Sequence, residues 1–108
     1  MGKSSYETAL IKQLLANLPW AVNLSQVRLG ALVDAAYNLG LGGLLEFGEA
    51  LGAMKAQDWV GAVNGFRQSL WYNQVPDRVN TICYMILFDE WAETYLTPKQ
   101  TQRLNEAL

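Results

Sequence analysis

Apolar residues recur at helical spacing along most of this chain, whereas segments that alternate apolar and polar residues between turn signals are essentially absent. The first stripe repeats every fourth residue and consists of Tyr6, Leu10, Leu14 and Leu18. Ser4 and Glu7 have the spacing of a capping box, and Pro19 is expected to end this helix. The sequence therefore predicts an all-α fold, a compact bundle of roughly five to seven short helices.

A second helix is expected to begin after a Ser25 cap and to run to about Leu39. Its apolar face consists mainly of leucine and alanine, so we expect it to be the central buried helix. Gly40 stands where a left-handed residue ends a helix. Residues 41–45 include two glycines, and this composition predicts a tight corner rather than a helix.

Five further helical segments are expected after this corner. Their approximate ranges are 46–56, 58–67, 70–74, 76–88 and 97–108. Asp58 is the expected cap of the second segment, and Pro76 suits the first position of the fourth. Thr97 and Gln100 have the spacing of a capping box, which predicts that they open a tail helix.

Size and composition favour one domain. A chain of 108 residues that is 51% apolar can close one core but not two, so residues 1–108 are expected to form a single domain. One cysteine, Cys83, excludes an internal disulfide, and the lack of histidine excludes imidazole chemistry. We expect no cofactor and no metal site, so any chemistry must depend on carboxylates, amides and arginine.

The charge distribution argues against several classes of partner. Eight basic and ten acidic residues are scattered singly, and no basic stripe of the kind that nucleic acid or an anionic membrane attracts is present. No uncharged stretch is apolar and long enough to cross a bilayer. Residues 1–5 lack the apolar core of a secretory signal, which predicts synthesis and residence in the cytoplasm.

Two groups of polar residues are candidates for a binding site. Asp34, Tyr37 and Asn38 share the face of the second helix that lies opposite its apolar stripe. The second group is Trp71–Arg78, where Arg78 falls in the first turn of the helix that begins at Pro76. The alternative interpretation of the first group is an ordinary solvated face.

These two groups carry a resemblance to a known family. From Pro19 to Trp91, without a gap, the chain resembles the C-terminal lobe of phage-type lysozymes, through Tyr37–Gly40 and above all Trp71–Arg78. The match covers about two thirds of the chain. It implies a lysozyme-like lobe over about residues 8–95, a tail helix beyond the family's lobe, and an origin in a phage or prophage with a bacterial host.

The resemblance also implies roles for the polar residues. In the family the matching faces line a cleft for peptidoglycan, so Tyr37 is expected to pack on a sugar ring and Asn38 to bind its N-acetyl group. Asp34 replaces a neutral amide there. Asn73 and Gln74 are expected at the rim of the cleft, although their amides could equally satisfy local backbone groups.

The family's catalytic residues are not expected in this chain. Their glutamate, aspartate and threonine lie in an N-terminal lobe that the resemblance does not include, and Arg78 matches an arginine that orients the catalytic glutamate from across the cleft. The alternative is that neighbouring Asp77 simply compensates the charge of Arg78. No motif supports an acid and base among the chain's own clustered carboxylates, which are Glu46, Glu49, Asp89, Glu90 and Glu93.

The helix after Pro76 is apolar on two sides. Tyr84, Met85 and Phe88 lie opposite its main apolar stripe, so we expect either the tail helix or another protein chain to cover them. A protein partner or a homo-oligomer would use this surface.

Three functions therefore remain open. The first is one wall of a muramidase cleft, which binds a glycan strand and cleaves the β-1,4 bond between N-acetylmuramic acid and N-acetylglucosamine only with a separately encoded catalytic lobe. The second is a non-catalytic module that binds a protein partner. The third is a folded remnant without activity.

Overall fold

The computed structural model describes residues 5–108, and in that range it contains seven α-helices and one 3₁₀ helix. They are α1 (Ser5–Asn17), η1 (Pro19–Asn23), α2 (Gln26–Leu45), α3 (Gly48–Lys55), α4 (Trp59–Arg67), α5 (Leu70–Gln74), α6 (Pro76–Phe88) and α7 (Pro98–Ala107). The all-α prediction is confirmed. Ser4, the expected cap of the first helix, lies outside the described residues.

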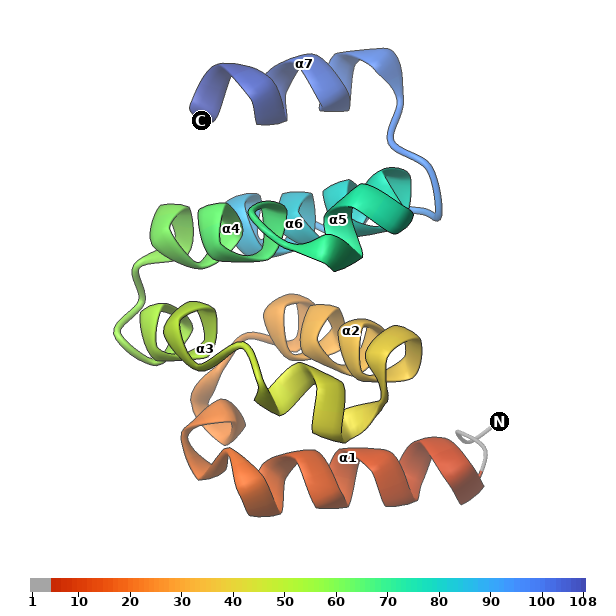
Figure 1. Ribbon diagram of the computed structural model, residues 1–108, viewed down its shortest axis with the longest axis vertical. Helices are drawn as coiled ribbons and strands as arrows, with labels where there is room; N and C mark the ends of the chain where they lie inside the picture. The colour runs from red at the N-terminus through yellow and green to blue at the C-terminus, as the bar shows by residue number, and fades with distance from the viewer. Residues whose placement is uncertain (1–4) are drawn as a thin grey trace.

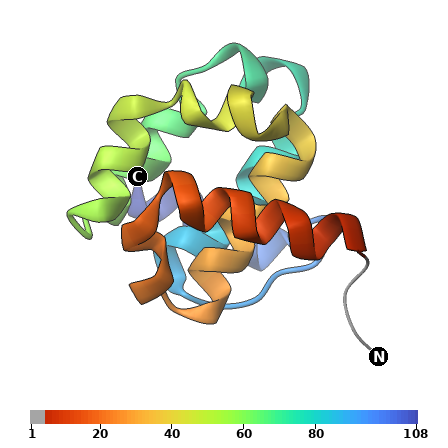
Figure 2. The ribbon, with the colours of Figure 1, turned by 90° about the horizontal axis from the view of Figure 1, so that it is seen from below.

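The helices form successive layers along the longest axis of the molecule. Figure 1 shows α1 at one end, then α2 with α3, then α4, α5 and α6, and finally α7 at the other end. Seen from below in Figure 2, α1 runs across its end of the molecule and covers part of α2. Leu10, Leu14 and Leu18 of the predicted apolar stripe are buried, whereas Tyr6 is exposed.

Side-chain caps begin several of the helices at the expected positions. The Ser25 side chain accepts a hydrogen bond from the backbone N–H of Arg28, and Asp58 accepts one from Gly61. Thr97 opens α7 with a complete capping box, in which Gln100 bonds back to the Thr97 backbone. These three predicted caps are confirmed.

The corner expected at residues 41–45 is wrong, because these residues are helical. Gly40 takes the whole change of direction by itself, with a φ of 73° and a ψ of 155°, and α2 resumes immediately after this kink. Leu44 in the resumed part is fully buried. Its packing stabilises a helical turn that the intrinsic propensity of two glycines does not favour.

The central helix is α6 rather than α2, contrary to expectation. Residues 81–86 are all buried, so this part of α6 is covered on every side, whereas α2 keeps one exposed face. The Thr81 hydroxyl is satisfied by the Asp77 carbonyl, at 3.1 Å, and by the Thr94 carbonyl, at 2.9 Å. Burial of a polar residue is tolerated here because its hydrogen bonds are made.

The tail helix covers the second apolar side of α6. Tyr84 and Met85 are buried and Phe88 is partly buried, while Leu104 of α7 is 1% exposed. We expected either the tail helix or another protein chain to cover this surface, and the structure shows the tail helix there. The surface that we expected a protein partner or a second copy to use at Tyr84, Met85 and Phe88 is therefore not open, since α7 already occupies it.

Arg28 closes the other end of α6. Its Nε donates to the Ile86 carbonyl at 2.7 Å, and its guanidinium lies 3.9 Å from the centre of the Trp59 ring on α4. A salt bridge of 3.8 Å joins it to Asp89, the left-handed residue that ends α6. One side chain thus connects α2, α4 and the unpaired carbonyls at the end of α6.

The contact between α6 and α7 can be tested with a leucine pair on the tail. Leu104→Ala should lower the free energy of unfolding by roughly 2–3 kcal/mol, because it removes a fully buried side chain. Leu108→Ala, at a site that is 39% exposed, should cost much less. Chemical denaturation measures both. Equal effects of the two variants would contradict a tail helix docked through Leu104.

Candidate functional site

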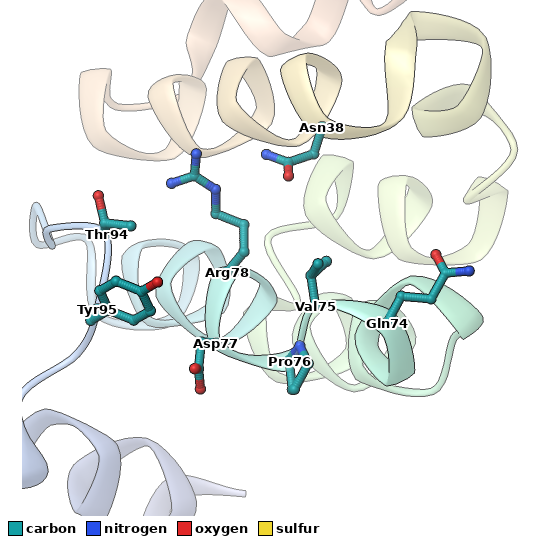
Figure 3. A pocket seen from close by; sticks show the side chains of 8 residues that line it. All are labelled: Asn38, Gln74, Val75, Pro76, Asp77, Arg78, Thr94 and Tyr95. Carbon is teal, nitrogen blue, oxygen red and sulfur yellow. The ribbon is translucent and has the colours of Figure 1, made fainter.

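A pocket of about 410 Å³ lies between α2, the junction of α5 and α6, and the segment that connects α6 to α7. Its lining residues, drawn in Figure 3, are Asn38, Gln74, Val75, Pro76, Asp77, Arg78, Thr94 and Tyr95. Three of the six residues predicted to bind a ligand, Asn38, Gln74 and Arg78, are thus brought together. They come from positions up to forty residues apart in the sequence.

Arg78 lies at the middle of the pocket. Pro76 begins α6 and places Arg78 in its first turn, and Figure 3 shows the guanidinium extending from α6 toward α2. The side chain is partly buried, yet within residues 5–108 it makes neither a salt bridge nor a hydrogen bond. Asp77 points away from it (Figure 3), so the proposed compensation of Arg78 by this neighbour does not take the form of an ion pair.

Asn38 faces Arg78 from the opposite wall. Its Nδ2 donates to the backbone carbonyl of Asp34 at 3.0 Å, which fixes the orientation of the amide. In Figure 3 the amide oxygen points from α2 toward α6, into the pocket, while the amide nitrogen lies on the side of Arg78. A ligand amide N–H would find an acceptor at this oxygen.

The two ends of the pocket differ in chemistry. Gln74 lies at one end with an exposed amide, next to the apolar surface of Val75 and Pro76. Thr94 and Tyr95 form the other end, and both were missed by the sequence analysis. No local pattern indicates them, because they reach the pocket only through the course of the chain between α6 and α7.

The other three predicted residues do not line this pocket. Asp34 borders a second hollow, of about 510 Å³, between α1, α2 and Trp91. Tyr37 packs edge to face against Tyr6 of α1, with ring centres 5.4 Å apart. Asn73 is exposed and lies outside both hollows. Their predicted roles in ligand binding remain predictions.

Burial raises the pKa of the Asp34 carboxyl group. Attraction to Arg78 acts in the opposite direction and is the smaller effect, while repulsion from Glu7 adds to the increase. The charge of Arg78 therefore extends to Asp34, although no salt bridge joins them.

Two of the five clustered carboxylates elsewhere have structural partners. Asp89 accepts a hydrogen bond from Ser25 and pairs with Arg28, and Glu90 pairs with Arg103 at 3.0 Å. Glu46 and Glu49 border a separate hollow on α3 that Ala50 and Gly65 also line. Burial raises the pKa of the Cys83 thiol to about 12, so this side chain is inert.

The described part of the chain contains neither a candidate metal site nor a candidate membrane span. Among residues 5–108 no three histidine, cysteine or acidic side chains cluster in a way that suits a metal ion. Within the same residues, none of the helices has the length and apolar character needed to span a membrane.

The fold and pocket define an all-α module with a mainly uncharged pocket around one arginine. No protein-family model matches the chain. Over 67 residues it is 42% identical to a protein described as pre-baseplate central spike protein Gp5, from Enterobacteria phage T4. The match covers 62% of this chain and 11% of that protein, so the chain spans about a tenth of the length of its relative. The similarity supports a phage origin.

The electrostatics of Asp34 predict an unusual effect of pH on stability. Because the pKa of Asp34 is raised in the folded chain, its ionised form destabilises the fold at neutral pH, and this cost is lost as the pH falls. Asp34→Asn should therefore raise the free energy of unfolding at pH 7, by up to roughly 0.5 kcal/mol. The difference in the free energy of unfolding between this variant and the parent should vanish at about pH 3, below the ordinary carboxyl range.

Glu90→Gln is the control, because the pKa of Glu90 is shifted in the opposite direction to that of Asp34. The hydrogen bond from Arg103 lowers the pKa of Glu90, so its carboxylate stabilises the fold above the ordinary glutamate range and loses this effect on acidification. This variant should be less stable than the parent at pH 7. Denaturation curves at several pH values measure both, and a destabilising Asp34→Asn at pH 7 would mean that attraction to Arg78 exceeds the cost of burial.

Proposed function

We propose that this chain is the C-terminal lobe of a phage-type muramidase and forms one wall of a cleft for peptidoglycan glycan strands. In this proposal the β-1,4 bond between N-acetylmuramic acid and N-acetylglucosamine is hydrolysed only when a catalytic lobe joins it, either as a separate chain or as part of a longer one. The motif Trp71–Arg78 and the pocket that contains its last residues support the proposal.

One observation carries the proposal, which is the state of Arg78. Its guanidinium is partly buried at the middle of a pocket and has no hydrogen-bonded partner within residues 5–108. A cation in such a place is stabilised by an oxyanion from outside, because guanidinium and carboxylate groups match in a two-bond geometry. A carboxylate of the catalytic lobe would satisfy Arg78 and would be oriented by it.

The rest of the pocket suits an N-acetylated sugar. Asn38 presents a fixed amide oxygen, and Gln74 adds a second amide that can donate and accept. Val75 and Pro76 provide apolar surface for the carbon face of a sugar ring. Tyr37, Asp34 and Asn73 are proposed to act outside this pocket, along the neighbouring surface of the cleft.

The chain is not proposed to hydrolyse glycan by itself. Glycoside hydrolysis uses two carboxyl groups that face each other across a cleft at roughly 5–9.5 Å. Asp77 is the one acidic residue among those that line the pocket, and its side chain points away from Arg78 (Figure 3). The acid and its companion carboxylate are therefore assigned to the other lobe.

A second candidate is a module of a phage particle that binds other proteins. The similarity to a protein described as a pre-baseplate central spike protein favours it. Such a role would need a surface other than Tyr84, Met85 and Phe88, because α7 covers them. The two functions are compatible if a particle protein carries a lysozyme-like lobe.

Incubation of the purified chain with intact sacculi tests glycan binding and hydrolysis together. We expect the chain to sediment with sacculi and to leave their turbidity unchanged. Asn38→Ala should weaken binding by roughly threefold to tenfold, because it removes a hydrogen bond worth about 1 kcal/mol. Asn64→Ala, an exposed asparagine on α4 outside the pocket, should bind like the parent. Clearing by the chain alone would contradict the proposal.

The role of Arg78 requires the other lobe. In a two-component lysis assay, the isolated catalytic lobe of a phage-type lysozyme is added to this chain, and the rate of turbidity loss is measured. Arg78→Ala should lower this rate by roughly 10- to 100-fold, the equivalent of one charged hydrogen bond. Arg78→Lys should recover part of it, and Lys55→Ala, on α3, should have no effect. An unchanged rate in Arg78→Ala would remove the proposed role.

A further inference from the structure

The segment between α6 and α7 does more than connect two helices. It contributes Thr94 and Tyr95 to the pocket around Arg78, so one wall of the candidate site is built by residues 89–97. Figure 3 shows the Tyr95 ring at the end of the pocket opposite Gln74, with its hydroxyl group directed toward the first turn of α6.

Tyr95 is held in an exposed position. Its side chain is 71% exposed, so one face of the ring is open to a ligand. It also borders a smaller hollow of about 210 Å³, together with Asp77, Asn80 and Thr101. The ring therefore forms a ridge between two hollows rather than part of the core.

Contacts on both sides of Tyr95 fix the course of this segment. Trp91 lies so close to α2 that a Cβ atom at Gly30 would be 2.7 Å from its ring, and only glycine allows this approach. The Thr94 carbonyl, next to Tyr95, accepts the hydroxyl of buried Thr81 at 2.9 Å. The segment is thus attached to α2 and to α6 before it reaches α7.

The tail helix completes the attachment. Arg103 donates to both carboxylate oxygens of Glu90 at 3.0 Å and to the Tyr84 hydroxyl at 3.0 Å. Its guanidinium also lies 3.9 Å from the centre of the Phe88 ring. Because Glu90 stands at the start of the segment and Arg103 lies in α7, this cluster joins the two ends of the segment that carries Tyr95.

We propose that Tyr95 is an additional ligand-binding residue of the site, an aromatic platform for a sugar ring adjacent to the one held at Arg78 and Asn38. The carbon face of a pyranose packs on such a ring, and the hydroxyl group of Tyr95, which has no hydrogen-bond partner among residues 5–108, can bond to the sugar. The α7 helix acts as a strap that keeps the platform in place before ligand binds, which saves the entropy of ordering it. This inference rests on the proposed function, since it assigns the ligand to the same glycan.

Binding of a β-1,4-linked N-acetylglucosamine tetrasaccharide, measured by calorimetry or by NMR titration of the full chain, tests the platform. Tyr95→Ala should raise the Kd about tenfold, or about 1.4 kcal/mol. Tyr95→Phe should stay within about threefold of the parent, because it keeps the ring. Leu70→Ala removes a side chain of the same exposure, 70%, outside the pocket and should leave the Kd unchanged.

A double-mutant cycle between Arg103 and Tyr95 tests whether α7 holds Tyr95 in place, with Arg103 as the positioning residue. Arg103→Ala should raise the Kd about threefold when Tyr95 is present and should have no effect in the Tyr95→Ala background. A merely structural role of Arg103 would instead weaken binding equally in both backgrounds. Equal effects would overturn the strap.

The outcomes separate this inference from the function on which it rests. If the parent binds the tetrasaccharide, and Asn38→Ala weakens binding while Tyr95→Ala does not, the platform is wrong and the glycan site stands. If the parent shows no binding at millimolar sugar, both are overturned. Because Tyr95 is exposed, its alanine variant should keep the thermal midpoint of the parent, which excludes misfolding as the cause of a lost affinity.

Discussion

The C-terminal end of α6 is fixed by one largely buried cation, Arg28, and the geometry of the pocket depends on this contact. Arg28 satisfies the last carbonyls of α6 from α2 and stacks on Trp59 of α4. With that end attached, the direction of α6 relative to α2 is set, and the first turn of α6 lies across from the exposed face of α2. Arg78 and Asn38 face each other for this reason, although neither contacts Arg28 in the structure.

Coverage of α6 on its second side has a functional consequence as well as an energetic one. A helix that is apolar on two sides must be covered on both, and α7 supplies the second cover through Leu104. To reach that position, the chain passes the pocket between α6 and α7 and leaves Thr94 and Tyr95 at its edge. Burial of the apolar surface and construction of the third wall of the pocket are thus achieved by the same segment.

Local signals in the sequence predict the helices well and the long-range contacts poorly. Ser25, Asp58 and Thr97 are found as caps, because capping depends on residues three positions away. The helical turn after Gly40 was not foreseen, since the packing of Leu44 outweighs glycine propensity there. The motif around Arg78 indicates half of the pocket, and no local pattern could indicate Tyr95, which arrives through tertiary structure.

We propose that a glycan strand binds at the pocket between α2 and α6. The most direct measurement is a two-dimensional ¹⁵N–¹H NMR titration of the labelled chain with soluble peptidoglycan glycan fragments. Binding at this pocket should shift the backbone and side-chain signals of Asn38, Gln74 and Arg78 progressively and leave the signals around Glu46 and Glu49 unchanged. Shifts confined to the α3 hollow, or no shifts at millimolar ligand, would contradict it.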